Sequence, residues 1–416
     1  MTADTKNSYD LIIIGGGLAG ASLACALHNM QKDQAMKIAV IEAHQLNTDA
    51  QPSYDDRTVA LSYGSRCIFD SMGLWPALEK HAEAINTIHI SDRGHFGVTR
   101  LTREQEGVDA LGYVIENKRL GEELYAAIEQ PFASEITVFC PARLTSLQQD
   151  DDSVTVTVSA EDEELTLTGK LLVAADGNNS QVMKLLNIGN QRKDYKQTAL
   201  ITNVTPGKQH NNVAYERFTE TGPLAFLPMQ KNRCSVVWTL TPESAEELSA
   251  LDDASFMQQL QQRFGFRLGQ IKKVGKRQSY PLFLQAATQT VFNRVVIIGN
   301  AAHSLHPVAG QGFNLALRDI AILSELIIDA QREGADIGNQ AMLQSYVQLR
   351  EQDIKRVYRF TDALVKTFSN NITALAHLRS LGLLMVDLMP AVKHQMATQS
   401  MGLSGRLSRL NRGLRL

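Results

Sequence analysis

The chain has 416 residues, with 41 lysines and arginines against 44 aspartates and glutamates, which gives a formal net charge of −3. This length predicts two closely joined domains, and the near balance of charge argues against a nucleic-acid partner. The four cysteines (Cys25, Cys67, Cys140 and Cys234) are scattered without a C-x-x-C pair, which indicates a reducing compartment and neither a disulfide nor a metal role.

An apolar strand, a glycine-rich turn and a helix open the chain. The strand is predicted over 10–14, the turn is GGGLAG, and the helix over 18–30 is followed by a second strand over 37–41. This is the G-x-G-x-x-G dinucleotide fingerprint in its strand–turn–helix–strand setting, although the motif does not separate FAD from NAD. The uncharged run over 11–27 is too short to cross a membrane, so we expect a cytoplasmic protein.

Five residues around this turn are candidates for contact with a dinucleotide. Gly15, Gly17 and Gly20 turn the chain and admit a pyrophosphate to the N-terminus of the helix, where free N–H groups favour an anion. Glu42 directly follows the second strand; it can accept hydrogen bonds from ribose hydroxyls and would repel a 2′-phosphate. Arg57 can lie along a pyrophosphate, or it can be an ordinary surface arginine.

The middle of the chain changes from an α/β pattern to antiparallel strands. A hairpin over 154–158 and from 165 leads into the strand LLVAA, which ends in the tight turn Asp176-Gly177. From 198 to 241, short strands separated by turn residues predict an antiparallel sheet. A sheet-built second domain is therefore inserted into the nucleotide domain, and a pocket is expected where the two meet.

One strand of this sheet offers candidates for the pocket wall. Alternate residues along 224–228 should face the pocket, although the sequence does not say which parity does so. Leu224, Phe226 and Pro228 are the substrate-contact candidates, with core packing as the alternative for each.

A second glycine-rich turn lies almost 280 residues after the first, in VVIIGNAAHSLHPVAGQGFNLALRD. A strand over 295–298 is followed by a loop with Pro307, Gly310 and Gly312, and then by a helix of roughly twenty residues. The glycines permit close approach of a ligand, and the helix N-terminus presents its free N–H groups to an electron-accepting part of a cofactor.

Two histidines, His303 and His306, precede this turn with H-x-x-H spacing. Because no neighbouring ligand residues accompany them, we expect no metal site. His303 is expected to pack within the motif, whereas His306, beside Pro307, is a candidate for the pocket with a structural role as the alternative.

Three ordered motifs, GGGLAG, AADGNNS and IGNAAHSLHPVAGQGFN, resemble those of the single-component flavoprotein aromatic hydroxylases. The segments DDRTVALSYGS, ISDRGH, ERFTETGPLAFLPM, RCSVVW and GKRQSYPL resemble the ubiquinone-biosynthesis branch of that family, in particular its 2-polyprenyl-6-methoxyphenol hydroxylases. The resemblance extends from about residue 8 to residue 390.

The resemblance implies an α/β fold: a Rossmann-like FAD-binding domain with an inserted antiparallel-sheet substrate domain and a helical C-terminus. The implied boundaries are 1–75, 110–185 and 285–345 for the FAD-binding domain, 76–109 and 186–284 for the substrate domain, and 346–416 for the C-terminal region. FAD would be the cofactor, NAD(P)H and O2 the co-substrates, and a polyprenylated phenol the substrate. The flavin would carry the chemistry, so no catalytic side chain is assigned.

The same resemblance places residues along the cofactor. Gly15, Gly17, Gly20 and Glu42 would hold the adenine end, and Asp176 and Gly177 would lie near the entrance where flavin and NAD(P)H meet. Asn300 would lie at the ribityl chain, and the segment from Pro307 through Gly310 and Gly312 to Asn314 would surround the isoalloxazine. A helix N-terminus there would stabilise the negative charge of reduced flavin.

Two positions depart from the family's pattern. Position 300 is Asn where the family usually has Asp, so an amide that both donates and accepts replaces a carboxylate. Ser180 is followed by Gln181, Val182 and Met183, whereas the family usually has Arg three residues after this Ser. We expect both departures to leave the flavin site in place.

The C-terminal segment from 390 to 416 carries five lysines and arginines and no acid. Leu403, Leu407, Leu410 and Leu414 recur at helical spacing among the arginines. This pattern predicts a basic amphipathic helix on an anionic membrane surface, and a solvated tail or a subunit contact is the alternative.

Three functions are consistent with these patterns. The first is an FAD-dependent monooxygenase that hydroxylates a polyprenylated phenol. The second is a related enzyme that acts at another ring position or as a flavin reductase, and the third is a non-catalytic FAD-bound subunit of a membrane-associated biosynthetic assembly. Trp75 and Trp238 cannot form the W-x-W pair of flavin halogenases, which disfavours that activity.

Overall fold

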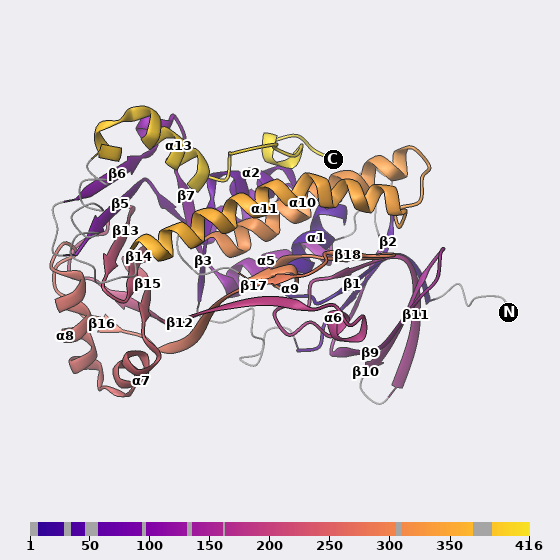
Figure 1. Ribbon diagram of the computed structural model, residues 1–416, viewed down its shortest axis with the longest axis horizontal. Coiled ribbons are helices and arrows are strands. Elements are labelled where there is room, and N and C mark those ends of the chain that lie inside the picture. Colours follow the sequence, from indigo (N-terminus) through magenta and orange to yellow (C-terminus); the bar gives the residue numbers. More distant parts are fainter. Residues whose placement is uncertain are drawn as a thin grey trace.

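The computed structural model describes residues 7–28, 35–45, 57–93, 97–130, 135–160, 163–304, 310–368 and 385–416. Within these ranges the strands form three sheets. Two long helices, α10 (Gln311–Arg332) and α11 (Gln340–Phe368), pack against each other and extend along the molecule (Figure 1). Helix α11 contacts β18 (Val291–Phe292) of one large sheet and β14 (Gly222–Met229) of the other, so it bridges the two.

The first large sheet is the mainly parallel one predicted from the N-terminal fingerprint. Its order is β18, β19 (Val295–Ile297), β11 (Glu163–Ala174), β1 (Ser8–Ile14), β2 (Lys37–Ile41) and β8 (Glu135–Phe139). The predicted hairpin is confirmed, because β10 (Val154–Ala160) pairs antiparallel with β11 and with β9 (Ala142–Gln149). Central strands of a parallel sheet are covered on both faces, which explains why β1 is a continuous apolar run.

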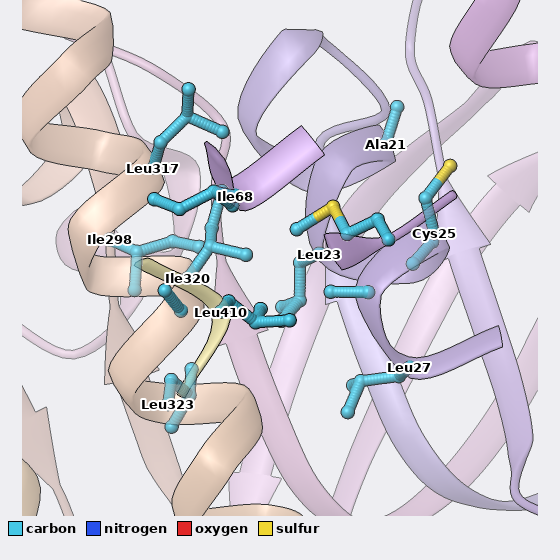
Figure 2. Close-up of a cluster of buried hydrophobic side chains, with 14 of the residues drawn as sticks. Ala21, Leu23, Cys25, Leu27, Ile68, Ile298, Leu317, Ile320, Leu323 and Leu410 are labelled. Atoms are coloured by element: carbon cyan, nitrogen blue, oxygen red, sulfur yellow. The ribbon is translucent and has the colours of Figure 1, made fainter. Parts of the chain in front are cut away.

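Helices α1 (Leu18–His28) and α5 (Asn117–Ile128) pack together beside this sheet, with α10 on the other side of α1. The resulting core draws on segments far apart in the sequence (Figure 2). It includes Leu23 and Leu27 of α1, Leu317, Ile320 and Leu323 of α10, and Ile68, Ile298 and Leu410. Because α1 is enclosed on several sides, it is apolar nearly all round rather than amphipathic.

The second large sheet is predominantly antiparallel. Its order is β20 (His303–Ser304), β17 (Gln278–Ala287), β12 (Asn190–Thr205), β15 (Arg233–Leu240), β14, β13 (Val213–Thr219), β5 (Thr87–Asp92) and β6 (Val98–Thr102), and β16 (Lys273–Val274) pairs with β12. One face packs beneath α7 (Pro242–Ala250) and α8 (Asp253–Phe264), where the Phe226 and Phe264 rings stack with centroids 3.8 Å apart. The strands predicted at 214–218, 224–227 and 234–240 are therefore confirmed.

A small sheet lies between the two larger ones. It consists of β3 (Thr58–Ser62), β7 (Gly112–Glu116) and β4 (Glu83–Ile85). The helical turns around it are α2 (Tyr63–Ser71), α3 (Trp75–Leu78), η3 (Glu79–His81) and α4 (Arg103–Glu106). Strand β4 pairs with β7 across the domain boundary expected at residue 109, so this sheet joins the two parts of the chain. The domain division itself stays a proposal.

The C-terminal segment corrects one expectation. Helix α13 (Pro390–Ser400) is followed by irregular chain and a single turn, η5 (Leu410–Arg412). The prediction of an amphipathic helix from Leu403 to Leu414 is therefore wrong. Gly402, Gly405 and Gly413 have φ of 71°, 89° and 79°, which interrupts a right-handed helix. The tail instead packs on α2 and α10 through η5, and membrane contact stays a prediction.

The described helices contain no segment both long enough and apolar enough to cross a membrane.

Candidate functional site

A cavity of about 740 Å³ lies between the parallel sheet and the antiparallel sheet. Most of the candidate cofactor residues that the structure describes line it, although they come from five separate segments. These are Gly17, Arg57, Gly177, Asn300, Gly310, Gly312 and Asn314. The cavity has the size of small-molecule and cofactor sites and the position expected of one, at a junction between sheets.

The N-terminal turn is shaped by steric limits at two glycines. Gly15 has φ of +101°, and a Cβ there would lie 2.6 Å from the carbonyl oxygen of Ala175. A Cβ on Gly20 would lie 1.8 Å from the carbonyl oxygen of Gly15. Neither residue lines the cavity; they let α1 approach the strands so closely that Gly17 and the first turn of the helix face it.

Glu42 braces the same turn. Its Oε2 accepts a hydrogen bond from the Gly16 backbone N–H at 2.7 Å, and its Oε1 accepts one from the His44 N–H at 2.8 Å. The Tyr125 hydroxyl donates to the Gly16 carbonyl at 2.8 Å. The carboxylate is buried beside the glycine turn, and the ribose contact stays a prediction.

Asp176 and Gly177 form the turn after β11. Asp176 Oδ2 accepts hydrogen bonds from the N–H groups of Gln181 and Val182 at 2.7 and 3.2 Å, at the start of α6 (Gln181–Leu185). Its Oδ1 is buried without a hydrogen-bond partner in the described chain, and burial raises the pKa of the carboxyl. A buried acceptor left without a partner costs free energy, so this oxygen suits a bound hydroxyl or N–H group.

The missing arginine after Ser180 has a structural counterpart. Met183 occupies that position and is 3% exposed, packed within the apolar cluster beside the parallel sheet. Ser180 caps α6 by accepting from the Met183 N–H at 3.1 Å. At this position the side chain therefore contributes to core packing, and the Ser180 cap of α6 is formed.

The late glycine turn contains an element that the sequence did not predict. After β19 the chain forms a short helix, α9 (Gly299–Ala302), before β20. Asn300 on α9 is exposed toward the cavity and has no hydrogen-bond partner among the described residues. The predicted long helix is confirmed as α10, with Gly310 as its left-handed N-cap at φ 62°. At Gly312 a Cβ would meet no atom of the described residues within 4 Å, so among these residues there is space in front of the helix N-terminus.

Asn314 holds that helix N-terminus in place. Its Oδ1 accepts from the Ser62 N–H and the Ser65 hydroxyl at 2.8 and 2.7 Å. Its Nδ2 donates to the carbonyls of Ala60 and Gly310 at 2.8 and 2.7 Å. The amide uses its full hydrogen-bonding capacity inside the protein, so it positions α10 against β3 and α2.

Arg57 lines the cavity where β3 begins. Its guanidinium lies over the Tyr280 ring of β17, 4.9 Å from the ring centroid. Both residues belong to the cavity wall, so the wall carries a cationic group at the start of β3.

The substrate-contact candidates on β14 need correction. Leu224 and Phe226 are 0% and 1% exposed and lie in the core beneath α8, and Pro228 shares their parity. The opposite parity, Ala225 and Leu227, lines the cavity. Both faces of β14 are covered, so the strand is apolar throughout and lacks the alternation that would have revealed its orientation.

Several residues of the cavity were missed from the sequence. The wall includes apolar side chains of the strands β4 to β7 together with an acid on β13: Ile85, Ile88, Ile90, Leu101, Leu111 and Glu216. Burial raises the pKa of Glu216 to about 7. The sequence signal for Glu216 was that it is the single acid among the alternate positions 214, 216 and 218, which are otherwise apolar. This signal can be recognised only when it is known which face of the strand lines the cavity.

A buried charge network lies behind the late turn and was also missed. His303 Nε2 and Asp319 Oδ2 are 2.6 Å apart, and Arg350 Nε donates to Asp319 Oδ1 at 2.7 Å. Arg350 and Arg318 both donate to Asp353 Oδ2, at 2.6 and 2.9 Å. Burial alone would raise the pKa of Asp319, but His303 and Arg350 outweigh it and hold that pKa below its usual value. The network ties α10 and α11 to the strand that precedes the glycine turn.

His303 thus packs within its motif, with its ring paired to Asp319. His306 and Pro307 lie outside the described residues. No cluster of three or more metal-ligating side chains occurs in the described part of the chain.

The arrangement fits FAD. Two helix N-termini, those of α1 and α10, border one cavity, as a pyrophosphate and the anionic edge of a reduced flavin require. Gly312 leaves space for a planar ring, Asn300 offers an unpaired amide, and Asp176 Oδ1 offers an unpaired acceptor. The chemistry of these groups matches an elongated cofactor with a phosphate centre and a hydroxylated chain.

Comparison with known proteins gives a consistent result. The family model described as FAD binding domain matches residues 8–361. The ubiquinone hydroxylase UbiL of Rhodospirillum rubrum is 37% identical, over 100% of this chain and 95% of that protein. The 3-demethoxyubiquinol 3-hydroxylase of Escherichia coli is 28% identical, over 96% of this chain and 100% of that protein.

A solved structure shares the fold. The p-nitrophenol 4-monooxygenase PnpA of Pseudomonas putida superposes with a TM-score of 0.79 at 18% identity, covering 96% of this chain and 99% of that one. At this identity the likeness concerns the fold, and it agrees with the expected α/β architecture with an inserted sheet and a helical C-terminal region.

Proposed function

The chain belongs to the FAD binding domain family of flavoprotein aromatic hydroxylases, and from this premise we propose that it hydroxylates the ring of a polyprenylated phenol in ubiquinone biosynthesis. The observation that carries the proposal is the single cavity shared by the flavin-type glycine turn and a strongly apolar sheet wall. The names of the UbiL and Escherichia coli relatives support the pathway and the ring hydroxylation.

The chain's own residues would hold the cofactor along the cavity. Gly17 and the start of α1 would receive the pyrophosphate, Asn300 the ribityl chain, and the N-terminus of α10 at Gly312 the ring. When bound, FAD takes a hydride from NAD(P)H and delivers one oxygen atom of O2 to the substrate ring while the other leaves as water. The helix N-terminus would stabilise the negative charge on the reduced ring.

The sheet wall would bind the substrate. Ile88 and Ile90 on β5, Leu101 on β6 and Leu111 offer an apolar surface to an aromatic ring with an aliphatic chain. The wall continues to Phe360 of α11 and Met396 of α13, where the prenyl chain would leave the ring's compartment. Such a lining excludes water from the site of oxygen transfer.

The test is a product analysis with the purified protein. FAD should copurify, and NAD(P)H and ¹⁸O2 with 2-prenylphenol should yield a ring-hydroxylated prenylphenol, a catechol or a hydroquinone, that contains one ¹⁸O atom. Protein without bound flavin would overturn the cofactor assignment. NAD(P)H oxidation that yields hydrogen peroxide alone would support a flavin reductase, and flavin without any oxidation would support a non-catalytic subunit.

The name of one relative supports an alternative, in which the chain hydroxylates another ring position. The Escherichia coli relative is named as a 3-hydroxylase of demethoxyubiquinol, so a demethoxyquinol is the second candidate substrate. Deleting the gene in its host and identifying the quinone precursor that accumulates would separate the two. Accumulation of a prenylphenol supports the proposal, and accumulation of a demethoxyquinol supports the alternative.

A further inference from the structure

Glu216 lies in the middle of the apolar cavity wall. Across the sheet its directly paired neighbours are Ile90 on β5 and Ala225 on β14, and Ala225 in turn pairs with Val237 on β15. All four of these residues line the cavity. The pairing register therefore places one carboxyl in a row of small and aliphatic side chains that face the same space.

The carboxyl of Glu216 has no hydrogen bond or ion pair with any described residue. The basic groups of the neighbouring strands belong to the alternate positions. His89 pairs directly with Arg100 and Tyr215, Arg217 donates to the Phe264 carbonyl, and Arg267 lies 3.3 Å from the Ser91 hydroxyl. These alternate positions share the parity of Tyr215, which also borders the cavity but whose ring packs edge-on against Phe264 under α8.

The other titratable groups along the cavity are few. Among the described residues they are Arg57, Tyr280 and Tyr215. Arg57 lies over the Tyr280 ring, and the Tyr280 hydroxyl donates to Gln278 Oε1 at 2.7 Å. The elements nearest Glu216, which are β5, β14 and β15, present Ile88, Ile90, Ala225, Leu227, Ser235 and Val237. Burial is the sole cause of the raised pKa of Glu216, with no charged neighbour contributing.

An isolated carboxyl in such a wall has two physical properties. It is a strong acceptor whose hydrogen-bonding capacity is unused by the protein, and a pKa of about 7 lets it exchange a proton at neutral pH. An aliphatic substrate would gain nothing from it, whereas a phenol would place its one donor group against it. Hydroxylation also requires an electron-rich ring, and a phenol becomes more electron-rich as its O–H proton is removed.

We propose that Glu216 accepts the hydrogen bond of the substrate's ring hydroxyl and takes its proton while oxygen is transferred to the ring. This inference rests on the proposed function and names the residue that recognises the phenol. The phenol O–H bond breaks, its electron pair feeds into the ring, and an O–H bond forms on the carboxylate. When the ring carbon loses its hydrogen as a proton to water, Glu216 returns its proton to the substrate oxygen and is regenerated.

Three variants test the assignment. Glu216→Gln keeps the size and an acceptor but removes the base, and Glu216→Asp keeps the base but withdraws it by one methylene. The matched control is Glu220→Gln on the same hairpin, because Glu220 pairs with Arg93 and Arg263 and is 49% exposed. Removing an unpaired charge should not impair folding, and Glu216→Asp keeps the test decisive should Glu216→Gln fail to fold.

The first measurement is binding, which requires no turnover. Dissociation constants of 2-prenylphenol and of prenylbenzene, which lacks the hydroxyl, are measured between pH 6 and pH 8.5. The wild-type protein should prefer the phenol by about tenfold at the upper pH, corresponding to one hydrogen bond to a charged acceptor. This preference should shrink toward pH 6 as the carboxylate is protonated. In Glu216→Gln it should be smaller and independent of pH, and Glu220→Gln should behave as wild type.

The second measurement is hydroxylation against pH. Wild-type kcat should fall about tenfold per unit below pH 7, and Glu216→Gln should lose about 10²-fold or more with a flat profile, the usual scale of general-base loss. Glu216→Asp should keep the profile at a reduced rate. NAD(P)H oxidation should continue in all variants, with more hydrogen peroxide from Glu216→Gln.

The outcomes distinguish a failure of the proposed function from a failure of the role assigned to Glu216. If wild type and Glu220→Gln hydroxylate no prenylphenol, the proposed function fails. If they do so and Glu216→Gln shows the wild-type phenol preference, pH profile and coupling, the proposed function stands and the role of Glu216 is overturned.

Discussion

Asp319 and Glu216 are both enclosed carboxyls near the same cavity, but their surroundings are opposite. Asp319 meets His303 and Arg350 at 2.6 and 2.7 Å, and its pKa is held below the usual value. Glu216 meets aliphatic side chains, and its pKa is raised to about 7. A buried carboxylate that is paired with basic side chains of the protein has a structural role, whereas an unpaired carboxyl in a cavity is available to a ligand.

The two regions also differ in how they hold a ligand. The proposed flavin end is built from backbone groups, with glycines at the turn and Asn314 fixing the start of α10 through four hydrogen bonds. The sheet end is built from side-chain faces, selected by strand parity. Rigid polar bracing suits a cofactor that stays bound, and a smooth apolar wall suits a substrate that must enter and leave.

The largest expected effect comes from breaking the matched charge. Asp319→Asn removes the carboxylate paired with His303 and leaves Arg318 and Arg350 to share the single charge of Asp353, so the free energy of unfolding should fall by roughly 3–5 kcal/mol. Urea unfolding at pH 7 measures it. Asp329→Asn on the same helix is the control: this side chain is 46% exposed and pairs with Arg409, so its loss should cost less than about 1 kcal/mol. Equal losses in the two variants would contradict an architectural role for Asp319.

Removing the unmatched charge should have the opposite sign. Burial raises the pKa of Glu216 from its ordinary value of 4.5 to about 7, so the folded protein binds the proton more tightly than the unfolded chain. The contribution of Glu216 to the free energy of unfolding of the wild-type protein is therefore fully present below about pH 4.5, where the carboxyl is protonated in both states. This contribution is lost as the pH rises through about 7.

Glu216→Gln should consequently be more stable than wild type by up to about 3 kcal/mol at pH 8, with no difference near pH 4.5. Denaturant unfolding of both proteins across this range provides the measurement. A stability difference that does not change with pH would show that Glu216 has a partner in the folded protein.

The two regions also differ in how much of their structure local sequence patterns could predict. The glycine turns, the hairpin into β11 and the strands of the inserted sheet rest on local signals, and the structure confirms these elements. Asp176 and Gly177 were also found locally, since a strand that ends in Asp-Gly has few conformations.

Long-range packing decided the features that were missed. The parity of β14 depends on α8 covering one face, and the run GPLAFLPM carries no alternation to show it. In the C-terminal segment the leucine spacing fitted a helix, but Leu410 is recruited into the core beside α1 and α10. The partners of Asp319 lie 16 residues before it and 31 after it, beyond any local pattern.

At the proposed flavin end, Gly310 and Gly312 are needed for different reasons. Gly310 adopts a left-handed backbone conformation, whereas Gly312 leaves space for the ligand. Gly310 has φ 62°, and a Cβ there would lie 3.0 Å from the Ala60 Cβ, so Gly310→Ala should lower stability by about 1–2 kcal/mol. Gly312→Ala meets nothing within 4 Å, so stability without cofactor should be unchanged or raised by up to about 1 kcal/mol. Its methyl group should nonetheless weaken FAD binding at least tenfold. Thermal unfolding of the apoprotein and titration with FAD check both, and undiminished FAD affinity in Gly312→Ala would place the ring elsewhere.

The smallest expected effect concerns Asn300. Its amide faces the cavity without a described partner, where the family's usual residue is a carboxylate. A carboxylate accepts a hydrogen bond more strongly than an amide, so Asn300→Asp should tighten FAD binding by about fivefold, or about 1 kcal/mol. Reconstitution of apoprotein with FAD, followed by flavin fluorescence, measures the change, and Asn300→Ala provides the opposite limit. Because Asn300 lies at the flavin end, the phenol preference at Glu216 should not move with it. A change in that preference would show that the two ends of the cavity are coupled through the bound cofactor.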